Sequence, residues 1–257
     1  MRQESMEQRI RVAVLGRNGR MGSEAVRAVS DAPDMDLVAA LGRTDDLSEL
    51  VRAGAKVVVD LTVPDATREN VRFAVSHGMH AVVGTTGWDD AALAELTAQL
   101  AESPGTGVLV APNFAVGAVL AMKFSELAAA FFDSVEIVEL HHPRKLDAPS
   151  GTAARTAELV AAAREAAGVA PSPDATESDP RGARGADVSG VHVHSVRLQG
   201  LVAHQETLLG NAGEQLSLRH DSFDRVSFMT GVLLGVRSVA EHPGLTHGLD
   251  GYMDLGL

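Results

Sequence analysis

The stretch Val12-Ala13-Val14-Leu15-Gly16-Arg17-Asn18-Gly19-Arg20-Met21-Gly22 decides the fold, because an apolar, β-branched run passes directly into a glycine loop. A helix is expected to follow over residues 20–30. A strand, a glycine loop and a helix in this order form a dinucleotide fingerprint, since glycines let backbone N–H groups and the helix N-terminus approach a pyrophosphate. The spacing is GxxGxxG, one residue longer at the front than the commonest form. The alternative is that these glycines only close a strand-to-helix turn.

Outward from this loop, the first third of the chain alternates short apolar runs with helix-like stretches. This pattern predicts a parallel sheet with both faces covered, and right-handed crossovers bring the carboxyl ends of its strands to one ligand-binding edge. We therefore expect an α/β, Rossmann-like, doubly wound parallel sheet. The expected strands are Ile10–Leu15, 37–41, 57–61, 81–83 and Gly107–Val110, and the expected helices are 20–30, 65–76 and 89–101.

The sequence pattern changes after Pro112, which predicts a second, α+β domain. Helices are expected over 116–131 and 152–166 and a strand over 135–140, whereas residues 168–187 lack apolar periodicity and predict a long loop. Strands over 191–198, 201–208 and 215–220 predict an open mixed, mostly antiparallel sheet. A last helix is expected over about 225–240. We predict a dinucleotide-binding domain over residues 1–112, completed by about 225–257, and a substrate-binding and oligomerisation domain over 113–224.

Composition excludes several classes of protein. The 257 residues are 45% hydrophobic and 22% charged, which excludes a disordered or fibrous chain. The absence of cysteine excludes disulfides, thiolate metal sites and a cysteine nucleophile. The net charge of −12 disfavours general binding to nucleic acid or to anionic membranes. No apolar run is long enough for a membrane span and the polar leader lacks the hydrophobic stretch of a secretory signal, so a cytoplasmic protein is expected.

The residues after the second expected strand bear on cofactor choice. An NAD enzyme usually places an acid there for the ribose 2′-hydroxyl, whereas this chain has Gly42-Arg43-Thr44. A guanidinium suits a 2′-phosphate, so we predict that NADPH serves at least as well as NADH. The alternative is a solvated Arg43, with Asp45 or Asp46 reaching back to the ribose.

Two further loops follow the fourth and fifth expected strands, where a nicotinamide and its ribose should lie. Their hydroxyl and amide groups suit a ribose and a carboxamide, but they can equally cap the next helix. The complete set of expected cofactor-binding residues is Gly16, Arg17, Asn18, Gly19, Arg20, Met21, Arg43, Gly84, Thr85, Thr86, Ala111, Pro112, Asn113 and Phe114.

The most unusual segment, Glu139-Leu140-His141-His142-Pro143-Arg144-Lys145-Leu146-Asp147-Ala148-Pro149-Ser150-Gly151-Thr152-Ala153, concentrates cations in an acidic protein. Two histidines and a lysine supply a proton donor near neutral pH and positive charge for an anion. Ser150-Gly151-Thr152 then opens a helix, whose free N–H groups form a carboxylate site. The segment predicts a small carboxylic acid as substrate. The alternative is an exposed basic loop with a serine cap.

Other kinds of site find less support. Glu139, His141 and His142, or the pair His192 and His194, could ligate a metal, but no third well-spaced ligand accompanies them, so we expect no metal. No lysine follows the sole tyrosine, Tyr252, which excludes a Tyr-x-x-x-Lys dehydrogenase. No Gly-x-Ser-x-Gly elbow is present for a hydrolase.

Taken together, these motifs resemble the 4-hydroxy-tetrahydrodipicolinate (dihydrodipicolinate) reductase family. The resemblance spans nearly the whole chain, and its most specific part is the His-His-x-x-Lys-x-Asp-Ala-Pro-Ser-Gly-Thr-Ala string. Two departures are visible: Trp88 replaces the usual Phe, and Gly42-Arg43 lacks the frequent acid, which bears on cofactor preference. The matching stretches are residues 16–22, 57–62 with Pro64, 84–87, 111–114 and 139–153.

The resemblance implies hydride transfer from NADPH or NADH to dihydrodipicolinate, a cyclic imine dicarboxylate formed by loss of water from the 4-hydroxy substrate. The product is tetrahydrodipicolinate, in the lysine and diaminopimelate branch of amino-acid biosynthesis. By carry-over, His141 and Lys145 are the proton-donating pair, His142 contacts substrate, and Gly151 and Thr152 bind a carboxylate. Family members are homotetramers built through their C-terminal sheets, so strands from Val191 onward are expected at an interface.

Two rival functions remain open at this point. One is another NAD(P)H-dependent reductase of a small carboxylate, such as an amino-acid dehydrogenase, which the Ser150-Gly151-Thr152 site alone would permit. The other is a non-catalytic NAD(P)-binding regulator, against which the basic segment from His141 to Lys145 argues.

Overall fold

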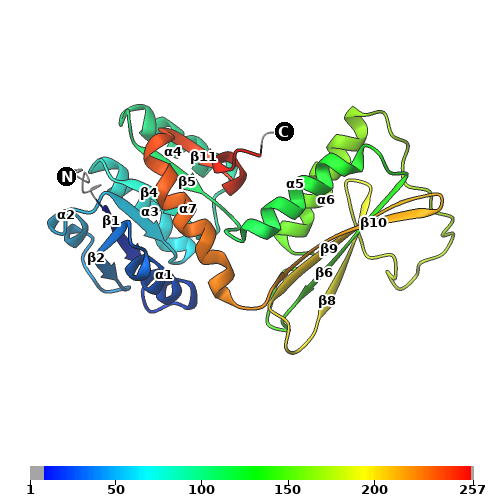
Figure 1. Ribbon diagram of the computed structural model, residues 1–257, viewed down its shortest axis with the longest axis horizontal. Coiled ribbons are helices and arrows are strands. Elements are labelled where there is room, and N and C mark those ends of the chain that lie inside the picture. Colours follow the sequence, from blue (N-terminus) through cyan, green and yellow to red (C-terminus); the bar gives the residue numbers. More distant parts are fainter. Residues whose placement is uncertain (1–8, 256–257) are drawn as a thin grey trace, which may run out of the picture. The chain divides into compact units, whose positions relative to one another are not determined.

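The computed structural model describes residues 9–255, which form two compact units, each with its own sheet (Figure 1). Unit 1 contains the described residues up to Ala115 together with those from Arg225 onward, and unit 2 is Val116–Asp224. No helix within residues 9–255 combines the length and the apolar character needed to cross a membrane.

Unit 1 is built on a six-stranded parallel sheet in the order β11-β5-β4-β3-β1-β2. Its central strands are valine-rich and buried, because helices cover both faces. The strands are β1 (Ile10–Leu15), β2 (Met35–Leu41), β3 (Val57–Asp60), β4 (His80–Val83), β5 (Gly107–Val110) and β11 (Gly244–His247). The helices are α1 (Arg20–Asp31), α2 (Ser48–Arg52), α3 (Pro64–Ser76), α4 (Asp90–Ala101) and α7 (Met229–Ser238), with 3₁₀ turns η1 (Arg225–Phe228), η2 (Val239–Glu241) and η3 (Leu249–Tyr252).

The expected Rossmann-like sheet is confirmed, with three differences in detail. The short helix α2 and the edge strand β11 were not predicted. The single helix expected over about 225–240 is instead a 3₁₀ turn, the helix α7 and a second 3₁₀ turn. β11 is only four residues long, and it becomes a strand by pairing in parallel with β5, a distant part of the chain. Local patterns do not carry that information.

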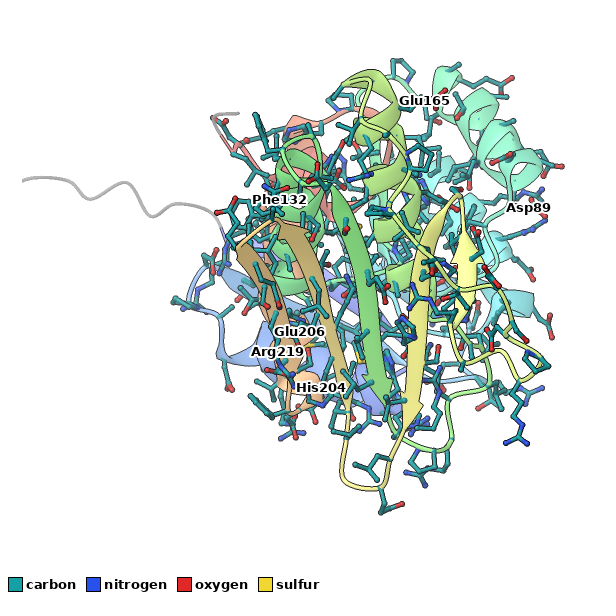
Figure 2. All side chains as sticks on the ribbon, turned by 90° about the vertical axis from the view of Figure 1, so that its right-hand side faces the viewer. Asp89, Phe132, Glu165, His204, Glu206 and Arg219 are labelled. Carbon is teal, nitrogen blue, oxygen red and sulfur yellow. The ribbon has the colours of Figure 1, made fainter. Side chains whose placement is uncertain are left out.

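Unit 2 has a five-stranded sheet in the order β10-β9-β6-β8-β7, with two helices on one face. Only β6 and β8 pair in parallel, so the expected mixed, mostly antiparallel sheet is confirmed. Figure 2 looks onto the other face, where His204, Glu206 and Arg219 lie in front of β9 and β10. The elements are α5 (Val116–Ala129), β6 (Ser134–His141), α6 (Gly151–Ala166), β7 (Ala186–Val188), β8 (Val191–Arg197), β9 (Ala203–Asn211) and β10 (Glu214–Ser222).

Strand β6 shows how alternation builds the core of unit 2. Val135 and Ile137 are buried against the helices, whereas Glu136 and Val138 point to the other face and are partly exposed. By this period Glu139 also belongs to the buried face, where an acid needs partners.

We predict that Ile137→Ala destabilises the protein by about 2–5 kcal/mol, because it leaves a cavity at a side chain with 0% exposure. Urea unfolding followed by circular dichroism measures the change. Leu127→Ala on α5, where 47% of the residue is exposed, is the control and should change stability by less than about 0.5 kcal/mol. Equal effects of the two substitutions would contradict this assignment of the core.

Candidate active site

The glycine loop between β1 and α1 has a backbone path that side chains would block. Gly16 has a φ of +89°, and a Cβ there would lie 2.6 Å from the carbonyl oxygen of Leu61. A Cβ on Gly22 would lie 2.0 Å from the carbonyl oxygen of Gly16. The N–H groups of Gly16 and Arg17 donate to the Leu41 carbonyl at 2.9 and 3.1 Å, which holds the loop on the end of β2. The loop therefore requires glycine at both positions.

The first turn of α1 is open to an anion. Gly19 occupies the N-cap, and no side chain of the described residues caps the helix. The first N–H groups of the helix belong to Arg20 and Met21, and the exposed Asn18 precedes them. Uncapped N–H groups and the helix dipole together favour a pyrophosphate. The loop and the helix start therefore fit a dinucleotide cofactor.

The end of β2 carries two arginines in different settings. Arg43 is exposed. Arg17 donates to the carbonyl of Ala40 at 2.5 Å, and its Nη2 lies 2.9 Å from Oδ2 of Asp45. The same Oδ2 accepts the N–H of Gly42 at 2.8 Å. Asp45, the acid considered above for the ribose, is thus engaged by Gly42 of its own loop and by Arg17 of the glycine loop.

A buried carboxylate joins the loops that follow β3 and β4. Asp60 is 0% exposed, and its Oδ1 accepts the N–H and the hydroxyl of Thr62 at 2.9 and 2.5 Å and the hydroxyl of Thr85 at 3.1 Å. Its Oδ2 accepts the Asn70 amide at 2.9 Å. Asp60 was not predicted; the available signal was an acid that ends the apolar Val57-Val58-Val59 run. It positions both loops at the carboxyl edge of the sheet.

The predicted residues of the loop after β4 differ in burial. Thr85 is 8% exposed and points inward to Asp60, whereas Thr86 is exposed. Gly84 is required by packing, because a Cβ there would lie 2.6 Å from the Leu61 side chain and 2.8 Å from the Phe114 ring. Thr86 is thus the side chain of this loop that a ligand can reach.

The residues of the loop after β5 differ in the same way. Ala111 and Phe114 are buried in unit 1, and Pro112 is exposed. Oδ1 of the partly exposed Asn113 accepts the N–H of Ala115 at 2.8 Å. This contact holds the asparagine within the loop, just before the start of α5.

In unit 2 the ends of β6 and β8 and the start of α6 meet at Glu139. This side chain is 0% exposed, and its Oε2 accepts Nδ1 of His141 at 2.5 Å and Nη1 of Arg197 at 2.8 Å. Its Oε1 accepts Nη2 of Arg197 at 2.7 Å and the N–H of Ser150 at 3.2 Å. Glu139, considered above as a metal ligand, is thus bound by protein donors. Arg197 was not predicted, because it reaches Glu139 only through the pairing of β6 with β8.

These donors decide the charge of Glu139. Burial by itself raises the pKa of this carboxyl, but hydrogen bonds from His141, Arg197 and Ser195 outweigh it and lower the pKa to about 2. Glu139 is therefore a carboxylate near neutral pH, and a carboxylate only accepts hydrogen bonds.

The loop after β6 carries Lys145 beside an acid. Nζ of Lys145 donates to the two carboxylate oxygens of Asp147 at 2.8 and 3.0 Å, and this contact lowers the pKa of Asp147. The N–H of Lys145 donates to the carbonyl of His142 at 3.2 Å, and Nη2 of Arg197 donates to the carbonyl of Asp147 at 2.8 Å. Of the predicted catalytic and substrate-binding residues, His142 and Lys145 therefore lie on this loop, between His141 at the end of β6 and the start of α6.

The start of α6 leaves room for a ligand. Ser150 is the N-cap, and its hydroxyl accepts the N–H of Ala153 at 3.2 Å. A Cβ added to Gly151 would meet nothing within 4 Å, so open space adjoins the first turn. Thr152 follows in the same turn. The position suits a carboxylate.

The histidines of β8 lie on the opposite face of the sheet in ion pairs. Nε2 of His194 lies 2.7 Å from Glu136, and Nε2 of His192 lies 3.7 Å from Asp174. Each imidazole thus has a carboxylate neighbour within unit 2.

Comparison with known proteins covers both units. The family described as "Dihydrodipicolinate reductase, N-terminus" matches residues 10–114, and "Dihydrodipicolinate reductase, C-terminus" matches residues 117–253. The chain is 63% identical to the 4-hydroxy-tetrahydrodipicolinate reductase of Streptomyces griseus and 62% identical to that of Streptomyces coelicolor. Each alignment covers 96% of this chain and 99% of the relative.

A solved structure is similar over the same length. Dihydrodipicolinate reductase from Paenisporosarcina sp. TG-14, with dipicolinate bound, is 41% identical, with a TM-score of 0.85. The match covers 96% of this chain and all of that one. With both family descriptions matched in order and relatives this similar over nearly their full length, the chain belongs to the dihydrodipicolinate reductase family.

Proposed function

We propose that the protein reduces 4-hydroxy-tetrahydrodipicolinate, by way of dihydrodipicolinate, to tetrahydrodipicolinate with NADPH or NADH, as a step of lysine and diaminopimelate biosynthesis. One observation in unit 2 carries the proposal. Glu139 binds His141 and the open start of α6, and Arg197 joins Glu139 to the loop that carries Lys145. Membership of the reductase family supports the same reaction.

The substrate side follows from charge and hydrogen bonding. The relative from Paenisporosarcina binds dipicolinate, a planar ring with two carboxylates. Here the N–H groups of Gly151 and Thr152 can receive one carboxylate, with His142 as a further contact. Lys145 is paired with the half-exposed Asp147, an anion that a substrate carboxylate can replace. These groups select a small dianion.

The protein's own part in the chemistry is proton delivery. Reduction of a conjugated imine moves electron density toward nitrogen, so a proton must reach the ring as the double bond is lost. We assign this delivery to His141 and Lys145, while Gly151 and Thr152 hold the ring in place.

The cofactor side belongs to unit 1. A nicotinamide cofactor supplies a hydride when it is bound. The pyrophosphate fits the loop from Gly16 to Gly22 and the first turn of α1, where glycine removes the side chains that would intrude. Arg43 suits a 2′-phosphate at the end of β2, and the exposed Thr86 and the partly exposed Asn113 suit the nicotinamide end.

We further propose a cytoplasmic homotetramer assembled through the sheet of unit 2. The face of that sheet opposite α5 and α6 presents partly exposed Val138, Leu140 and Val196. Charged groups of β9 and β10 border it, including the pair of Arg219 with Glu206 (Figure 2). An apolar patch with a polar rim is typical of a subunit interface.

We predict that His141→Ala and Lys145→Ala lower kcat by roughly 100-fold or more, because each removes a proton donor. The dissociation constant for NADPH should change less than about twofold, since neither residue belongs to unit 1. Steady-state kinetics and fluorescence titration measure the two effects. A large loss of cofactor affinity with kcat retained would overturn both roles.

We predict that Arg43→Ala raises the KM for NADPH by roughly tenfold and leaves that for NADH nearly unchanged, because only NADPH carries the 2′-phosphate. Arg52→Ala is the control, since it removes an exposed arginine of α2 that pairs with Asp46. An unchanged KM for NADPH would remove Arg43 from the cofactor site.

We predict that pyridine-2,6-dicarboxylate raises the melting temperature in the presence of NADPH, since a ligand that binds only the native state stabilises it. Gly151→Pro, which introduces a ring at the open helix start, should abolish the shift while NADPH alone still stabilises the variant. A non-catalytic regulator would show no shift with the dicarboxylate under any condition.

A further inference from the structure

We propose that Glu139 and Arg197 are positioning residues for proton delivery, which fix the ring, the tautomer and the charge of His141. The inference rests on the proposed function in one respect, namely that His141 delivers a proton. Neither positioning residue is proposed to touch the substrate.

The Glu139 carboxylate has no freedom to turn. Its contacts come from a strand end, a second strand and a helix start: His141, both terminal nitrogens of Arg197, the side chain of Ser195 and the N–H of Ser150. Each oxygen thus accepts at least two hydrogen bonds, which is the usual capacity of a carboxylate oxygen. Rotation would leave buried donors unpaired.

The contact with Glu139 determines the tautomer of His141. Because the pKa of Glu139 is about 2, the carboxylate has no proton to give, and Nδ1 of His141 must be the donor in their 2.5 Å contact. The nitrogen that can exchange a proton with another molecule is then Nε2. The ring is 14% exposed, so it reaches solvent while its Nδ1 side stays fixed. Glu139 thus sets which nitrogen is active.

Arg197 supplies the positive charge that balances the Glu139 carboxylate. Burial without a nearby cation raises the pKa of a carboxyl group and so favours its protonated form. The two parallel hydrogen bonds from Arg197 oppose this effect and keep Glu139 ionised. Arg197 also binds the Asp147 carbonyl, so it ties the strand that carries His141 to the loop that carries Lys145.

In register, His141 lies opposite Arg197 of β8 and Ala203 of β9. The next residue of β9 is His204, which pairs with Asp221. The titratable groups of the following loop are His142, Arg144, Lys145 and Asp147, and the last two pair with each other. Glu139 contacts His141 directly, so loss of its charge should be felt at His141.

Strand β6 offers a matched control on its other face. Glu136 contacts an arginine and a histidine, Arg184 and His194, as Glu139 contacts Arg197 and His141. The Glu136 side chain, however, is 33% exposed and lies far from the proposed proton donors in register. Glu136→Gln removes the same kind of charge from the same strand.

The test compares Glu139→Gln with Glu136→Gln in the full chain, after circular dichroism and light scattering show wild-type folding and size. Glu139→Gln should lower kcat roughly 100-fold with an unchanged dissociation constant for NADPH. The alkaline limb of the kcat profile should move to lower pH, because an amide stabilises an imidazolium less than a carboxylate does. Glu136→Gln should keep the wild-type kcat and profile.

Arg197→Lys should recover part of the kcat lost in Arg197→Met, since it keeps the charge but not the paired geometry. A Glu139→Gln enzyme with wild-type kcat and pH profile, while His141→Ala is impaired, would overturn the positioning role alone. Wild-type kcat in His141→Ala would instead overturn the proposed role of His141. If Glu139→Gln does not fold, ¹H–¹⁵N correlation of the wild-type imidazoles decides: the proposal requires neutral His141 to carry its proton on Nδ1, and a proton on Nε2 refutes it.

Discussion

The buried carboxylate of Glu139 is the constraint on which the rest of unit 2 depends. An acid with no exposed surface is costly unless every oxygen is bound, and here the donors come from His141, Arg197 and Ser150. Those donors belong to three elements that are separate in the sequence. Because they all bind one carboxylate, the end of β6, the end of β8 and the start of α6 are held together. The same contacts that remove an energetic penalty also join His141, the proposed proton donor, to the helix start that we propose as the carboxylate site.

Unit 1 uses a related arrangement with a different choice of donors. Asp60 is also buried at the carboxyl end of a strand, but the hydroxyls of Thr62 and Thr85 and the amide of Asn70 bind it in place of an arginine. Neutral donors are sufficient where the purpose is to hold two loops at the sheet edge. In unit 2 the carboxylate binds an arginine and an imidazole, Arg197 and His141.

Much of this organisation could be predicted from local sequence. The glycine loop, the valine-rich strands and the alternation of Val135, Ile137 and Glu139 are short-range patterns, and the structure follows them. β11 and Arg197 could not be predicted in the same way, because each acquires its role by pairing with a strand far away in the chain. The setting of Asp45 was equally hidden, since its partner Arg17 lies in the preceding loop. Glu139 was noticed as a possible metal ligand, and only its donors show that it binds protein groups instead.

The protein is a reductase, and we propose that its unit 2 binds a small cyclic dicarboxylate and delivers protons to it. The most direct measurement is the oxidation of NADPH and NADH by the purified protein, with substrate generated in place from pyruvate and aspartate semialdehyde by the preceding synthase. The account predicts rapid oxidation that requires the synthase and both of its substrates. Binding of both cofactors without any substrate-dependent oxidation would contradict it.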